Sequence, residues 1–149
     1  MRLFVQRVRE ASVTVEGEVL GEIGRGLVVF VGIAEGDTCQ ISDKLVDKLA
    51  KLRIFEDEDG KTNLSISDAG GSFLVISQFT LYADCRKGNR PSFTKAGNPR
   101  LANELYQYVI HRLQEKGFAV EQGRFGADMK VALVNDGPFT VLLDSEEML

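Results

Sequence analysis

The sequence predicts an α/β (α+β) fold in which a mostly antiparallel sheet is flanked by two main helices. Several short segments are apolar throughout or alternate apolar and polar residues, as β-strands do. Two longer segments carry apolar residues at every third or fourth position, which is the spacing of a helix packed on a sheet. No repeat, low-complexity tract or linker interrupts the chain, so we expect one domain over residues 1–149.

Strand-like segments come first, and short turns separate them. They comprise residues 3–8, 11–15, 19–23 and 27–33. Residues 11–15 (Ala-Ser-Val-Thr-Val) alternate apolar and polar side chains, which is typical of a strand with one buried face. Residues 16–18 (Glu-Gly-Glu) and 24–26 (Gly-Arg-Gly) supply the residues expected in turns between paired strands.

Two polar residues, Gln6 and Arg7, interrupt the apolar pattern of the first strand. An arginine at such a position usually covers a sheet edge with its aliphatic stem, and we favour this interpretation. The alternative is that its guanidinium group donates hydrogen bonds to a backbone carbonyl and anchors a neighbouring segment.

The central strand is predicted at residues 73–76, directly after two glycines. Its residues Phe-Leu-Val-Ile do not alternate, so the strand should be buried on both faces. The chain then becomes polar at residues 77–80 (Ser77, Gln78, Phe79, Thr80) without forming an obvious loop. Burying a hydroxyl or amide group unpaired costs about 1–3 kcal/mol, so these groups need partners. We favour a neighbouring strand as the source, because most buried polar groups are satisfied inside the protein. A bound ligand is the alternative.

Two helices are predicted from their caps and apolar stripes. The first begins at Asp37, with Gln40 three residues later in a capping-box-like arrangement. The second begins at Asn98-Pro99 and ends at Lys116-Gly117. The stripes consist of Ile41, Leu45, Leu49 and Leu52 in the first helix and of Leu101, Leu105, Tyr108 and Val109 in the second.

The carboxyl-terminal part predicts three short strands separated by two loops. The strands are expected at residues 118–121, at residues 131–134 and in a last segment that ends at Leu143. The loop at residues 135–140 contains Gly137-Pro138, for which a plain β-turn is the simplest interpretation. Alternatively, because glycine lacks a Cβ, the two carbonyls of this dipeptide could approach a ligand closely.

The charge distribution is uneven along the chain. The formal net charge is −4, which argues weakly against a nucleic-acid-binding protein. Residues 84–100, however, carry a net charge of +4 and leave −8 on the remainder. Their basic residues are Arg86, Lys87, Arg90, Lys95 and Arg100. This segment is either a phosphate-binding site or a solvated charged loop.

Several function classes find no support in the sequence. The only histidine, His111, lies off its helix stripe and should be solvated, and there is no Gly-x-Ser-x-Gly elbow for a serine triad. Metal-ligand clusters and Gly-x-Gly-x-x-Gly are absent, and residues 56–60 (Glu-Asp-Glu-Asp-Gly) are typical of an acidic turn, so we expect no metal and no cofactor. Cys39 and Cys85 suggest free thiols, and we expect a cytoplasmic protein without a signal peptide or membrane span. An enzyme of this kind would depend on backbone N–H groups or on its substrate.

The polar segments resemble the signature segments of the D-aminoacyl-tRNA deacylase family. They comprise residues 77–84, 86–88, 90–93, 123–129 and 135–140, with similarity also at residues 6–8 and 53–55. The resemblance covers essentially the whole chain. It implies a closed β-barrel-like sheet flanked by helices, a homodimer with its site at the interface, no cofactor, and D-aminoacyl-tRNA and glycyl-tRNA as substrates.

The resemblance also implies roles for individual residues. Ser77, Gln78, Phe79 and Thr80 would form the catalytic segment, whose backbone N–H groups polarise the ester while the 2′-hydroxyl of the tRNA assists. Substrate binding and chiral selection would involve Gly137, Pro138, Arg7 and Met129, with the Gly137-Pro138 dipeptide inserted in cis from the other subunit. Beyond the resemblance, we infer that the basic segment contacts acceptor-stem phosphates of the tRNA, with Arg86, Lys87, Arg90 and Lys95 as the candidate residues.

Two other functions remain compatible with the same residues. A non-catalytic RNA-binding barrel would use the same basic segment and groove. A serine hydrolase would use Ser77 as its nucleophile, and Ser77→Ala would then abolish turnover.

Overall fold

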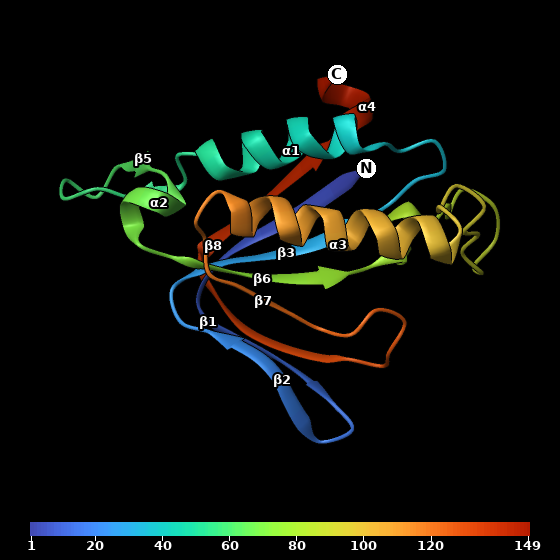
Figure 1. The fold of residues 1–149 in the computed structure, drawn as a ribbon, viewed down its shortest axis with the longest axis horizontal. Coiled ribbons are helices and arrows are strands. Elements are labelled where there is room, and N and C mark those ends of the chain that lie inside the picture. The colour runs from blue at the N-terminus through green and yellow to red at the C-terminus, as the bar shows by residue number, and fades with distance from the viewer.

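A strongly curled sheet with two helices on one face forms the molecule (Figure 1). The structure is a computed structural model that describes residues 1–149. The sheet strands are β1 (Arg2–Val15), β2 (Glu18–Ile23), β3 (Gly26–Gly32), β6 (Ser72–Ser77), β7 (Val120–Gln122) and β8 (Lys130–Asp144). The helices are α1 (Cys39–Lys51), α2 (Ile66–Ala69), α3 (Pro99–Glu115) and α4 (Ser145–Met148). A small hairpin, β4 (Phe55–Glu56) and β5 (Thr62–Leu64), stands apart from the sheet.

The strand order is β2-β1-β3-β6-β7, and β8 pairs with the free side of β1. Strand β1 pairs antiparallel with β2, β3 and β8, whereas β6 pairs parallel with both β3 and β7. The parallel pairs follow from the connections, because α1 and α3 cross over between the strands they join. An added Cβ on Gly21 of β2 would lie 3.2 Å from the Gln122 carbonyl oxygen of β7, so the curl brings the two edges together. The predicted barrel-like, mostly antiparallel sheet is confirmed.

The first and last strands are longer than the sequence pattern predicts. The segments at 3–8 and 11–15 form one strand, and the two last predicted strands also merge into one. The β-turn expected at residues 135–140 is wrong. In its place β8 contains a bulge, in which the residues between Asn135 and Thr140 face only Arg7 of β1. The Asn135 amide closes the bulge, because its Oδ1 accepts a hydrogen bond from the Phe139 N–H at 2.7 Å.

The sheet has an apolar core on each face. One core lies between the sheet and the helices, and the other lies inside the curl. Strand β6 contributes to both, since Phe73 and Val75 join the first core and Leu74 and Ile76 join the second. All four side chains are at most 2% exposed, which confirms the predicted two-sided burial.

The helix caps and stripes follow the predictions in part. Asn98 caps α3 through a bond from the Leu101 N–H, as predicted. Helix α1 is capped by Thr38 instead of Asp37. The Asp37 carboxylate is buried and accepts from the Ala34 N–H at 2.7 Å and from the Met1 amino group at 2.8 Å, so it is occupied elsewhere.

The buried face of α3 is wider than predicted. It consists of Ala102, Leu105, Tyr106, Val109, Ile110 and Leu113. Tyr106 takes the place expected for Tyr108, and its hydroxyl donates to the Val75 carbonyl of β6 at 2.8 Å. Tyr108 is half-buried and its hydroxyl donates to Asp43 on α1.

Smaller features complete the comparison with the sequence. Strand β7 begins later than predicted, because Phe118 packs edge-on against Phe73 with ring centroids 5.1 Å apart. The acidic segment is the predicted turn, in which Asp57 Oδ1 accepts from the N–H groups of Asp59 and Lys61. No helix combines the length and apolar composition that a bilayer span requires.

Candidate active site

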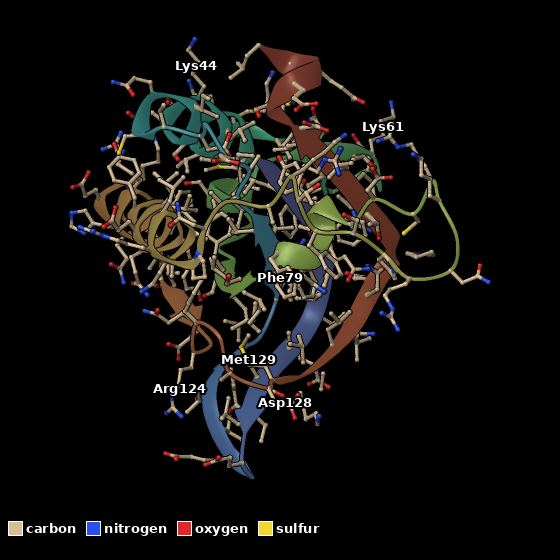
Figure 2. The ribbon with its side chains drawn as sticks, turned by 90° about the vertical axis from the view of Figure 1, so that its right-hand side faces the viewer. Lys44, Lys61, Phe79, Arg124, Asp128 and Met129 are labelled. Carbon is tan, nitrogen blue, oxygen red and sulfur yellow. The ribbon has the colours of Figure 1, made fainter.

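A cleft of about 1090 Å³ opens at the carboxyl end of β6. Its walls come from the ends of β3 and β6, from the segment before α3, and from the loop before β8. Figure 2 shows Phe79 above Met129 and Asp128, which lie on the loop before β8, and all three residues line the cleft. All four predicted catalytic residues, Ser77 to Thr80, line the cleft together with Met129.

The segment after β6 forms a short 3₁₀ turn at Phe79–Tyr82. The Gln78 N–H donates to the Val31 carbonyl at 2.8 Å and continues the pairing with β3, after which the chain turns. The N–H groups of Phe79 and Thr80 begin this turn and therefore have no acceptor within it. These two donors are available at the wall of the cleft.

The side chains of this segment differ from the expectation. Ser77 and Gln78 are half-buried, Thr80 is exposed, and none of the three side chains forms a hydrogen bond within the protein. The favoured interpretation, in which a neighbouring strand satisfies them, is wrong. Because β6 ends at Ser77, these groups face the cleft, where water or a ligand can reach them.

The residue that fixes the turn, Arg2, was not predicted from the sequence. Arg2 donates from Nη1 to the Leu81 carbonyl at 2.6 Å and from Nε to the buried Asp144 carboxylate at 2.9 Å. Its guanidinium carbon also lies 4.6 Å from the centroid of the Tyr82 ring. Arg2 interrupts the same apolar strand as Arg7, and this shared signal could have identified it.

Aromatic side chains form the mouth of the cleft. Phe79 and Phe93 meet edge to face with centroids 4.9 Å apart, and they are 55% and 38% exposed. Phe93 belongs to the basic segment, so that segment forms one side of the entrance.

Residues 84–95, hereafter the basic loop, are held in a defined shape. Asp84 and Ser92 exchange two backbone hydrogen bonds of 2.7 and 2.9 Å. The Arg86 guanidinium donates to both carboxylate oxygens of Asp84, and these bonds lower the pKa of that carboxyl to about 2. Lys87, Arg90 and Lys95 are exposed and form no ion pair.

The Gly137-Pro138 dipeptide lies outside the cleft. Both residues are exposed in the β8 bulge, and their peptide bond is cis. Arg7 of β1 anchors the bulge and is only 5% exposed. Its guanidinium donates from Nε to the Asp136 carbonyl at 2.8 Å and from Nη1 to the Ile54 carbonyl at 2.7 Å. The carbonyl-anchoring alternative for Arg7 is therefore correct, and the edge-covering interpretation is wrong. Neither Arg7 nor the dipeptide contributes to the cleft of its own chain.

Comparison with known proteins assigns this fold and sequence to a family. Residues 4–144 match the family described as D-Tyr-tRNA(Tyr) deacylase. The chain belongs to this deacylase family. The D-aminoacyl-tRNA deacylases of Desulfitobacterium hafniense (strain DSM 10664 / DCB-2) and Thermotoga petrophila are each 56% identical, over 99% of this chain and 99% of their own. The solved structure of the c-Myc DNA Unwinding Element Binding Protein is 41% identical, covers 97% of this chain and 98% of its own, and superposes with a TM-score of 0.91.

The deacylase assignment makes the protein a hydrolase that acts on the ester bond of aminoacyl-tRNA. The side chains that line the cleft offer this deacylase little acid–base chemistry. His111 is exposed on α3 and pairs with Glu115, as predicted for a solvated histidine. The carboxylate that lines the cleft, Asp128, is itself largely exposed and pairs with Lys130 at 3.1 Å. No group of three or more His, Cys, Asp or Glu side chains is placed to hold a metal ion.

Proposed function

We propose that the protein hydrolyses D-aminoacyl-tRNA in the cytoplasm, and glycyl-tRNA as well, to free amino acid and tRNA while it rejects L-aminoacyl-tRNA. This activity is a chiral proofreading step in translation quality control, carried by the single domain of residues 1–149. The observation that supports it most directly is a cleft whose wall presents the free N–H groups of Phe79 and Thr80.

The backbone and the substrate carry the reaction. The two N–H groups donate to the ester carbonyl oxygen and stabilise the negative charge that develops when water attacks the carbonyl carbon. The bond from that carbon to the ribose oxygen breaks, and the ribose oxygen takes up a proton with the help of the neighbouring 2′-hydroxyl. Ser77, Gln78 and Thr80 orient the substrate through side chains that have no partner within the protein.

Chiral selection comes from a second copy of the chain. Gly137-Pro138 is exposed and absent from its own cleft, so it is free to enter the cleft of a partner. On the sheet face away from the helices, Leu142 of β8 is 49% exposed beside Phe4 of β1, and Thr140 of β8 pairs with Gln6. A two-fold dimer across this strip exchanges the two dipeptides.

The inserted dipeptide sets the stereochemistry by exclusion. Its carbonyls accept hydrogen bonds from the substrate α-ammonium group, while Met129 lines the opposite wall. In this position an L side chain would overlap with the protein backbone, whereas a D side chain points into the open cleft. Glycine has no side chain and is accepted.

Hydrolysis of D-Tyr-tRNA, L-Tyr-tRNA and Gly-tRNA tests the proposal. We expect loss of the ester from the D-tyrosyl and glycyl forms, and no loss above the spontaneous rate from the L-tyrosyl form. Release of labelled amino acid is the measurement. A non-catalytic RNA-binding barrel would bind all three RNAs and leave their esters intact. Equal cleavage of D and L forms would contradict the role of the dipeptide.

Ser77→Ala separates the backbone mechanism from a serine nucleophile. We expect kcat/KM on D-Tyr-tRNA to fall by about tenfold or less, because one neutral hydrogen bond contributes about 1 kcal/mol. Loss of a nucleophile would lower kcat by a factor on the order of a million. Ser67→Ala is the matched control, since Ser67 is exposed on α2 and lies outside the cleft. A million-fold loss in Ser77→Ala alone would establish Ser77 as the nucleophile.

A further inference from the structure

The basic loop carries unpaired positive charge on a protein whose net charge is negative. Of the five cations in residues 84–100, Arg86 is paired with Asp84 and Arg100 with Glu104. Lys87, Arg90 and Lys95 form no ion pair. Their charge is therefore fully available to an anionic partner.

Hydrogen bonds within the protein fix the conformation of the loop that carries these cations. The two backbone bonds between Asp84 and Ser92 close the tip, which contains Lys87 and Arg90. The Arg86–Asp84 pair and the left-handed Gly88, with φ of 63°, shape the tip. A loop with a fixed shape loses less conformational entropy when it binds.

The base of the loop is fixed to the cleft. Phe93 packs on Phe79, and the Gly97 N–H donates to the Ile33 carbonyl at 2.9 Å. The Lys95 carbonyl accepts from the Glu35 N–H at 3.2 Å. The loop therefore projects from a wall of the cleft, on one side of a chain that places its terminal ester there.

We propose that the basic loop binds backbone phosphates of the single-stranded acceptor end of the tRNA, through Lys87, Arg90 and Lys95. This inference rests on the proposed function, and it names the part of the substrate that the loop recognises. Arg86 stays a candidate contact through its free Nη1, but its Nε and Nη2 bond Asp84, so the three unpaired cations carry the proposal. The loop adds affinity for RNA without selecting the amino acid.

Salt dependence tests the proposal with the double variant Lys87→Ala/Arg90→Ala. Each phosphate contact to a single strand contributes about 0.7 to the slope of log(kcat/KM) against log[salt]. The variant should therefore lose about 1.4 of the slope on D-Tyr-tRNA, and between 50 and 200 mM salt its kcat/KM should fall about sevenfold less than that of the unmodified protein. The D-tyrosyl ester of adenosine has no phosphates, so the variant should cleave it at the unmodified rate.

The matched control is Lys44→Ala/Lys61→Ala, which removes the same charge. Lys44 projects from α1 away from Phe79 (Figure 2). Lys61 lies between β4 and β5, and this hairpin is at the opposite end of the molecule from the loop before α3 (Figure 1). This variant should keep the unmodified salt slope. Equal slopes for the two double variants would overturn the proposal, and so would an equal loss on the adenosine ester, which would make the loop part of the cleft wall. If the unmodified protein cleaves neither substrate, the proposed function itself fails.

Discussion

Gly26→Ala is expected to lower the free energy of unfolding by more than about 4 kcal/mol. Because domains unfold with about 5–15 kcal/mol, this loss removes a large part of the total stability. A Cβ added at Gly26 would lie 1.9 Å from the Ser72 carbonyl oxygen and 2.8 Å from the Ser72 backbone nitrogen. These atoms belong to the first paired residue of β6, and Gly26 is also paired with Val8 of β1. Because all of them are backbone atoms of the central sheet, the overlap cannot be relieved by rotating a side chain.

Gly24→Ala, two residues earlier, is the control. No heavy atom lies within 4 Å of a Cβ added there, and Gly24 is exposed in the turn before β3. We expect this variant to change stability by less than about 0.5 kcal/mol. Urea unfolding followed by circular dichroism gives both values. Similar midpoints for the two variants would mean that β3 and β6 can separate at this point without a large cost.

The elements that depend on local pattern were predictable from the sequence. The Asn98 cap, the end of α3 at Lys116-Gly117 and the two-sided burial of residues 73–76 each follow from a few neighbouring residues. The bulge at residues 136–139 was not predictable from the sequence. It is defined by its register against β1, which lies more than a hundred residues earlier in the chain. Local turn chemistry alone favours a β-turn at Gly-Pro, and long-range pairing overrides it here.

Part of the candidate site was likewise predictable from the sequence, and part was not. Residues 77–80 are contiguous, so their unusual polarity is visible in the sequence and the structure places them together in the cleft. The opposite walls come from residues 93–99 and 125–129, which meet only after folding. The direction of the side chains of Ser77 and Thr80 was not predictable, since it depends on where the pairing of β3 with β6 ends.

Arg7→Ala is expected to destabilise the protein by about 3 kcal/mol, because it leaves the Asp136 and Ile54 carbonyls without their donor. The guanidinium carbon also lies 4.8 Å from the centroid of the Phe139 ring, so packing is lost as well. Arg7→Lys should recover only part of the lost stability. A lysine ammonium group cannot donate to both carbonyls and also stack on the ring in the same geometry. Urea unfolding measures the loss, and Arg9→Ala, at an exposed position of the same strand, should leave stability within about 0.5 kcal/mol.

The same variant tests whether the β8 bulge contributes to catalysis, as we propose. Asp136 and Phe139 flank Gly137-Pro138, and Arg7 contacts both, so its removal frees the dipeptide at its two ends. In the proposed dimer a displacement of about 1 Å at the partner cleft lowers kcat/KM on D-Tyr-tRNA by about a hundredfold. The assay is run where the variant is fully folded, so that lost stability and lost positioning are measured separately. A folded Arg7→Ala protein with undiminished activity and unchanged preference for the D form would mean that selection of handedness does not depend on the position of this bulge.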